Sequence, residues 1–316
     1  MPKGIFSADP PQHTNIRAAM ERLFMSAIDG IADVVNSEAR TLLREAKVSA
    51  RFDLYSAYAL ALPPRVLFTV LGLPPADWGG IEQWVAAIVA GNDPTQSIAV
   101  QAGAGPCAFA LLAYYQALMA QCPHLGDPSK LTATSTQAAA SNPHFSMDQA
   151  LASLQNVTVA GYLSTTLLLA TGVYELLRDA SALADLRANM DLLRLNAPVQ
   201  LVDRVAAKTT VLGGVTIPKG AKVVGVIGSA NRDTPVFSDP DKLDIRRDNT
   251  RQFAFGGADH ECLGEPLIKM VAPIGLRTLL NELPFMRLAG ISHGHIAMAN
   301  LSIFALGQQS ADCNGA

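Results

Sequence analysis

The stretch Phe255-Gly-Gly-Ala-Asp-His-Glu-Cys-Leu-Gly264 places a cysteine in a glycine-rich loop. Apolar residues at helical spacing follow over Leu267–Leu283 and predict a helix directly after this loop. Free N–H groups at a helix N-terminus stabilise a thiolate, and glycines let the backbone approach a flat ligand. His260 can reach an anionic group beside a metal held by such a sulfur. A buried, unreactive cysteine is the commoner fate of a free thiol and remains the alternative on these residues alone.

The rest of the chain is apolar and almost neutral. Its 316 residues are 49% hydrophobic and 16% charged, with a net charge of −3. This length suffices for one large domain or two ordinary ones. No basic block or basic–aromatic stripe occurs, so we predict no nucleic-acid partner. No signal-peptide pattern and no C-x-x-C pair are present, so we expect a cytoplasmic protein without a disulfide framework.

The first two-thirds of the chain has helical periodicity. The longest predicted helix starts near Ser146 and runs to Arg178, and Ser146 with Gln149 forms a capping-box pattern. Further helices are predicted over Asn15–Phe24, Ile28–Glu45, Pro64–Leu71, Ala76–Ala90, Ala108–Gln121 and Ala182–Leu195.

Two segments, Pro94–Gly126 and Gln149–Tyr174, lack charged residues. Either is long enough for a membrane span, which needs about 20 mostly apolar residues. The second carries several hydroxyl and amide side chains and is predicted to be a buried core helix. Pro106 predicts that the first breaks into two helices, and weak membrane contact there stays an alternative.

The last third is predicted to be partly β. Arg204–Val226 alternates in polarity and contains the turn signals Gly213-Gly214 and Pro218-Lys219-Gly220. A strand pair is predicted over His293–Leu306, where His293 and His295 share a face. Two histidines alone are a weak metal signal, so a turn beside a pocket is the preferred interpretation.

No repeat or flexible linker divides the chain, so we predict one domain over 1–316. It comprises a helix-rich part (11–198), hairpins and an irregular stretch (199–257), the cysteine loop with the last helix (255–283), and the C-terminal strand pair (293–306).

The cysteine loop resembles the haem-binding signature of the cytochrome P450 family, F-G-x-G-x-H-x-C-x-G. It matches at Phe255, Gly256, His260, Cys262 and Gly264, whereas Ala258 replaces the second pattern glycine. Other segments resemble the family in the same order along nearly the whole chain. They are Ala8–Arg17, Leu192–Pro198, Gly214–Pro218, Ser229–Asp233, Val236-Phe237 and Asp239–Asp241.

This resemblance implies a mainly α fold with small β-sheets and haem b as cofactor, with Cys262 as the axial thiolate. It also implies that His13 and Arg17, Arg204, and His260 hold the haem propionates. Buried carboxylates need paired cations or donors, which makes this set chemically sensible.

The resemblance further implies an apolar small-molecule substrate and an electron donor such as a ferredoxin with its reductase. Ser164 and Thr165 would handle oxygen. The substrate pocket would be formed by Ala160, Gly161, Val199, Val202 and Ile296.

Two departures concern the site and its support. In Ala160–Thr165, Leu163 replaces the family's acid and Ser164 its key threonine, so proton delivery must differ from the usual acid–alcohol pair. Asp191-Leu-Leu-Arg194 replaces the structural E-x-x-R. Lys242 is expected in place of that network's third arginine, which would weaken it because lysine lacks the planar fork.

The chain begins almost at the family's third helix, so we expect the fold to lack the usual N-terminal helices and first strands. A sheet edge would then be uncovered, which invites pairing. We expect a second copy, a carrier protein or a bulky substrate to cover it. A truncated gene product or a misassigned start codon is the alternative.

Asp259, Glu261 and Glu265 surround the cysteine and would repel an acidic ferredoxin. The alternative is that these acids only favour the positive end of the following helix.

Three functions are compatible with these residues. The first is a P450 monooxygenase, in secondary metabolism for example. The second is a P450-fold haem enzyme with other chemistry, such as peroxide-driven oxidation, dehydration or cyclisation, which the missing acid favours. The third is a non-catalytic homologue that acts as a partner protein. The intact cysteine loop argues against this third function.

Overall fold

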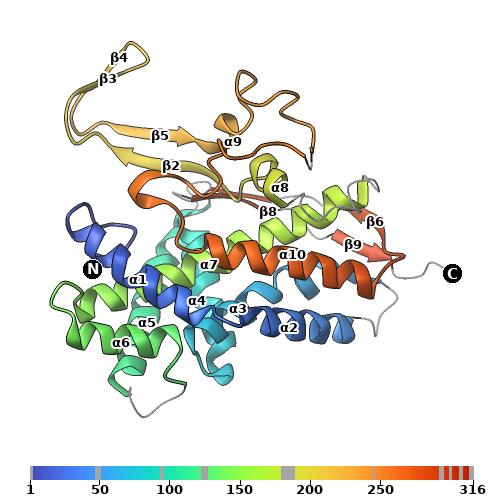
Figure 1. Cartoon of the computed structure of the whole chain (residues 1–316), viewed down its shortest axis with the longest axis horizontal. Coiled ribbons are helices and arrows are strands. Elements are labelled where there is room, and N and C mark those ends of the chain that lie inside the picture. Colours follow the sequence, from blue (N-terminus) through green and yellow to red (C-terminus); the bar gives the residue numbers. More distant parts are fainter. Residues whose placement is uncertain are drawn as a thin grey trace.

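The computed structural model describes residues 3–46, 51–92, 96–121, 127–178, 189–244, 246–291, 295–298, 301–305 and 309–312. Helices form the body of the molecule, and small antiparallel sheets lie along one side of it (Figure 1). The helices are α1 (Gln12–Ala27), α2 (Ile31–Ala46), α3 (Leu62–Leu71), α4 (Trp78–Gly91), α5 (Ile98–Gln121), α6 (Leu131–Ser141), α7 (Met147–Arg178), α8 (Asn189–Leu195), α9 (Ile227–Ala230) and α10 (Glu265–Glu282).

Three sheets accompany the helices, with short helical turns η1 (Tyr55–Ala59), η2 (Pro75–Asp77) and η5 (Ala258–His260) between elements. One sheet has the order β1 (Arg51–Asp53), β9 (Gln309–Asp312), β6 (Arg287–Ile291). The second has the order β5 (Lys222–Val226), β2 (Val199–Val205), β8 (Leu301–Ala305), β7 (His295–Met298). The third is the hairpin of β3 (Thr210–Leu212) and β4 (Val215–Ile217).

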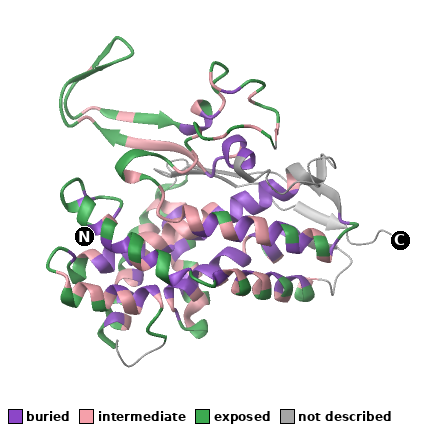
Figure 2. Cartoon of the chain, in the orientation of Figure 1, coloured by how far each residue is buried: buried purple, intermediate pink, exposed green. Residues whose placement is uncertain are grey.

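Helix α7 runs through the centre of the molecule and carries one wall of the site. The predicted capping box starts it: the Ser146 N–H donates to Gln149 Oε1 at 2.8 Å, and the Gln149 N–H donates to Ser146 Oγ at 3.3 Å. Residues 165–173 of this helix, including Leu167 and Leu169, are buried, and α7 packs against α3, α8 and α10 (Figure 2). This explains why the segment lacks charges, since burying an unpaired charge is costly.

Helix α5 differs from its prediction. It continues through Pro106 as one helix, whereas the sequence predicted a break there. A proline removes one intrahelical hydrogen bond, and extensive packing against α4 holds the remainder together. By length and composition, both α5 and α7 could cross a membrane. Most of α7 is buried, but only 11% of the apolar window of α5 is.

Other predicted elements agree to within a few residues, including the hairpin with left-handed Gly213 and Gly214 and the C-terminal strand pair β7–β8. Helix α6 and the β1–β9–β6 sheet were missed. The first part of the predicted helix Ala182–Leu195 and His293 lie outside the described residues, as do the side chains of His295 and Ile296.

Candidate active site

The cysteine loop enters the site between η5 and α10. The Cys262 N–H donates to the Phe255 carbonyl at 2.8 Å, which closes the loop. The backbone N–H groups of Gly264 and Glu265, at the start of α10, reach the sulfur. Burial nonetheless raises the pKa of the Cys262 thiol above its usual range, and these N–H groups oppose that only in part. A metal cation bound to the sulfur would supply the further stabilisation that a thiolate needs here.

The glycine replaced in this loop has a structural consequence. Ala258 adopts φ +56°, in the left-handed region that favours glycine. The loop therefore keeps the backbone path of a glycine at the cost of local strain. The neighbouring Gly256, at φ +75°, takes the same region without strain.

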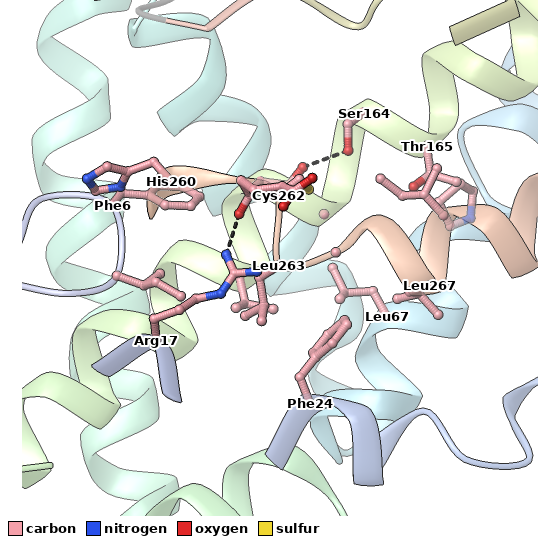
Figure 3. Close-up of a pocket in the computed structure, with 18 of the residues that line it drawn as sticks. Phe6, Arg17, Phe24, Leu67, Ser164, Thr165, His260, Cys262, Leu263 and Leu267 are labelled. Atoms are coloured by element: carbon pink, nitrogen blue, oxygen red, sulfur yellow. Dashed lines mark hydrogen bonds between the residues drawn. The ribbon is translucent and has the colours of Figure 1, made fainter. Parts of the chain in front are cut away.

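Helix α7 faces the cysteine across a pocket. Ala160, Gly161, Ser164 and Thr165 line it from one face of the helix (Figure 3). The Ser164 hydroxyl donates to the Ala160 carbonyl at 3.0 Å, within its own helix. The buried Thr165 hydroxyl has no hydrogen-bond partner among the described residues, so its proton remains free for a ligand.

Cationic and donor groups gather at one end of this pocket. The rings of His13 on α1 and His260 on η5 lie 4.1 Å apart. Arg17, one turn after His13, donates to the Glu261 carbonyl and pairs with Glu21 at 3.4 Å (Figure 3). His13 is 2% exposed, yet its Nε2 has no hydrogen-bond partner in the described structure.

The surroundings of His13 shift its pKa. Burial lowers the pKa of His13, and the neighbouring His260 and Arg17 lower it further. Three basic groups therefore meet around a buried, unused nitrogen. A ligand carboxylate at this position would satisfy the nitrogen and offset the repulsion.

The remaining walls of the pocket are mostly apolar. It holds about 800 Å³ of space without protein atoms, part of which is open to solvent. Phe24, Leu67, Leu263 and Leu267 are among its walls (Figure 3). A flat apolar group with carboxylates at one edge and a metal at its centre matches this distribution of side chains.

Several predicted site residues are not brought into this pocket. Arg204 is exposed on β2 and donates to the Asp203 carbonyl at 2.8 Å. Val199 and Val202, on the same strand, do not line the pocket, and Phe255 lies outside it with the Lys269 ammonium 5.9 Å from its ring centre. The side chain of Ile296 is not among those that the structure describes, so its role in the pocket stays a prediction.

The sequence analysis missed pocket residues from the start of the chain. Ile5 and Phe6 line the pocket, although their segment has neither helical nor strand periodicity. The only signal in the sequence was a short apolar run before the first helix. Such a run does not indicate which part of the molecule its side chains pack against. The packing of Gly4 against Ala152 on α7 positions this segment.

A buried ion cluster joins α8 to the irregular stretch that precedes the cysteine loop. Asp191 Oδ1 lies 2.6 Å from Arg194 Nε and 3.1 Å from Arg247 Nε. Arg247 therefore takes the third position, and the expectation that Lys242 would do so was wrong. Lys242 contributes only its backbone carbonyl, 3.3 Å from Arg194 Nη2. Arg247, five residues further along, thus supplies the second guanidinium of the cluster.

Comparison with known proteins agrees with this geometry. A family model described as cytochrome P450 matches residues 190–287. Cytochrome P450 109 of Bacillus spizizenii is 31% identical over 293 residues, which cover 88% of this chain and 72% of that protein. The chain belongs to the cytochrome P450 family. Cytochrome P450 monooxygenase PikC of Streptomyces venezuelae is 30% identical, covering 89% of this P450 and 68% of its own length.

Solved P450 structures share the fold. CYP109E1 of Bacillus megaterium has a TM-score of 0.89 at 23% identity, and covers 99% of this chain and 84% of its own. P450BioI, solved with a fatty-acyl carrier protein, has a TM-score of 0.88 at 24% identity over 98% and 81% of the two chains. The predicted mainly α P450 fold is confirmed. As a member of this family, the protein is a haem–thiolate monooxygenase that uses a substrate and an electron donor.

Proposed function

We propose that this P450 oxidises an apolar small molecule in the pocket between Cys262 and α7, with the Cys262 sulfur as the axial haem ligand. One observation carries the assignment: the buried sulfur lines the same pocket as the polar face of α7 and the basic group around His13. Bound there, the haem supplies the oxygen-activating redox chemistry.

In this proposal each group of residues has one task. The N–H groups of Gly264 and Glu265 orient the sulfur. His13, Arg17 and His260 hold the haem carboxylates, and the unused Nε2 of His13 gains its partner from them. Ile5, Phe6 and the apolar walls exclude water and select an apolar substrate. We propose that the chain works as one domain in the cytoplasm.

Proton supply distinguishes this site. Leu163 offers no acid, and the Ser164 hydroxyl already donates to the Ala160 carbonyl. We propose that the Thr165 hydroxyl, with water behind it, would donate protons to a ligand in this pocket. The same feature favours a second candidate function, peroxide-driven oxidation, because peroxide brings both oxygen atoms and protons with it.

Product formation from one substrate distinguishes these two functions. Turnover with a ferredoxin, its reductase and NADH supports the monooxygenase, whereas turnover only with hydrogen peroxide supports the second function. The surface on which the electron donor docks also matters, because the exposed Asp259 and Glu261 disfavour the binding of an acidic ferredoxin. A carrier-bound acyl chain is a further substrate to include, since P450BioI was solved with one.

The test of the site itself is the absorption spectrum of the reduced, carbon-monoxide-bound protein. We expect the red-shifted Soret band of a thiolate ligand in the wild type and in Cys107→Ala, whose cysteine lies on α5. Cys262→Ala should lose this band. A band typical of a histidine ligand in the wild type, or a thiolate band retained by Cys262→Ala, would contradict the assignment.

A further inference from the structure

One region of the surface holds an unusual concentration of exposed apolar side chains. Six of the fourteen large hydrophobic residues that are exposed among the described residues lie within 205–226, each 45–69% exposed. They are Val205, Val211, Leu212, Val215, Val224 and Val226. Exposed apolar side chains concentrated in one segment indicate a candidate interaction site in a folded protein.

The same region contains an open sheet edge. In the part of the chain that the structure describes, β5 pairs only with β2, so its other side has no neighbouring strand. An unpaired strand presents a row of backbone N–H and C=O groups. The β3–β4 hairpin projects from the body beside this strand (Figure 1), and Figure 2 shows it exposed along its length.

Apolar side chains and free backbone groups lie together on β5. The register pairs Val205 with Lys222, so Val224 and Val226 lie on the same sheet face as Val205. Val205, Val224 and Val226 are exposed on this face, and Val223 on the opposite face is partly buried. An added strand would therefore gain main-chain hydrogen bonds along the edge and side-chain contacts on one face.

The charge of the region indicates the chemistry of that strand. Residues 203–226 contain four basic side chains and one acidic side chain, in a protein whose net charge is −3. The one acid, Asp203, pairs with Lys222 at 2.6 Å. Arg204, Lys208 and Lys219 form no ion pair with any described residue.

These observations separate three classes of occupant. A second copy would bring the same basic segment against this one, and like charges oppose such a contact. A lipid surface would suit the valines and lysines, but acyl chains cannot satisfy the free backbone groups of an edge strand. An extended polypeptide with acidic side chains satisfies the backbone groups, the valines and the lysines together.

We propose that the open edge of β5 is a docking site for an extended, acidic segment of a partner polypeptide, which adds to the sheet as a further strand. Its apolar residues lie against Val224 and Val226. Its acidic residues pair with Lys219 and Lys208. These two lysines lie beyond Lys222, at the end of the sheet edge where β5 begins. The site is separate from the haem pocket and does not depend on the proposed chemistry.

A pair of labelled peptides tests this site on the full, haem-loaded chain. The probes are fluorescein-labelled peptides E-V-T-V-T-E and K-V-T-V-T-K, measured by fluorescence polarisation. We expect saturable binding of the acidic peptide only, weakened by salt as charge pairing requires. Val224→Glu should weaken binding by about tenfold or more, because it adds a like charge and removes an apolar contact. Val224→Thr keeps strand propensity and should retain most of the binding.

Ile98→Glu is the matched control, since it removes an apolar side chain that is 86% exposed on α5 and should not change binding. Thermal unfolding shows whether each variant is folded. Equal binding of both peptides, no saturable binding, or equal loss in Ile98→Glu would overturn the proposal. Dimerisation that is abolished by Val224→Glu would also overturn the proposal, because the occupant would then be a second copy. Co-sedimentation with anionic phosphatidylserine vesicles that the acidic peptide does not displace would overturn it as well.

Discussion

At the scale of single residues, the two hydroxyls on α7 are not equivalent. The Ser164 proton is used within the helix, whereas the buried Thr165 hydroxyl lines the pocket without a partner. Family resemblance alone placed the key hydroxyl at Ser164. The hydrogen bonds indicate that Thr165 is the donor available to a ligand.

This difference predicts which variant loses coupling between reductant and product. Thr165→Val keeps the side-chain shape and should lower the product formed per NADH by roughly tenfold or more, with hydrogen peroxide released instead. Ser164→Ala should have the smaller effect. The measurement is product, NADH and peroxide in one assay, with the carbon–oxygen stretching frequency of the carbon-monoxide complex as a readout independent of turnover. A larger loss in Ser164→Ala would reverse the assignment.

Ala258 stores strain that a glycine would remove. Its φ of +56° costs an ordinary residue about 1–2 kcal/mol. Replacing Ala258 by glycine removes this cost, but the greater flexibility of glycine in the unfolded chain offsets part of the gain. Ala258→Gly should therefore raise the free energy of unfolding by about 0.5–1 kcal/mol. Urea denaturation measures it. Ala254→Gly, directly before the loop and not at positive φ, should lose stability, and a gain in both variants would show that strain is not the cause.

At the scale of elements, the buried ion cluster joins α8 to the irregular stretch that precedes the cysteine loop. Arg194, fully buried, also donates to the carbonyls of Asn231 at 2.9 Å and Pro240 at 2.7 Å. Asp191 accepts the Asp244 N–H at 2.6 Å. A segment with little regular structure is thus held in place by charge-assisted hydrogen bonds, and through it the cysteine loop.

Removing the shared acid should therefore be severe. Asp191→Ala leaves Arg194 buried without its counter-ion and should cost about 3–5 kcal/mol of unfolding free energy. Asp241→Ala removes an 83% exposed partner of Arg232 and should cost less than about 1 kcal/mol. Denaturant titration compares the two. Similar losses would mean that the cluster contributes no more than a surface pair.

At the scale of the whole molecule, the proposed haem pocket lies where α1, α3, α7 and α10 meet, so we expect its filling to affect the entire helical body. A ligand that binds only the folded state stabilises it by about 4 kcal/mol at a thousandfold excess over its dissociation constant. Removing the haem should thus lower Tm by roughly 10 °C. Scanning calorimetry with and without added haemin measures this. Cys262→Ala should gain less from haemin, and an unchanged wild-type Tm would contradict the pocket assignment.

Much of this protein could be predicted from its sequence because the controlling interactions are local. The capping box at Ser146, the glycine turn at Gly213-Gly214 and the helix after the cysteine loop each depend on a few adjacent residues. The cysteine loop is likewise contiguous, so its residue pattern was enough to indicate the family.

Tertiary structure decided what depends on residues distant in sequence. Arg247 rather than Lys242 completes the buried cluster, because the path of the irregular stretch brings its guanidinium to Asp191. Ile5 joins the pocket and Arg204 does not, since their positions follow from the packing of the first residues on α7 and from the register of β2 with β5. The sequence determined the chemistry of the ligand loop and the local elements. The three-dimensional packing selected which side chains surround the pocket, because contacts between distant segments leave no periodic signal in the chain.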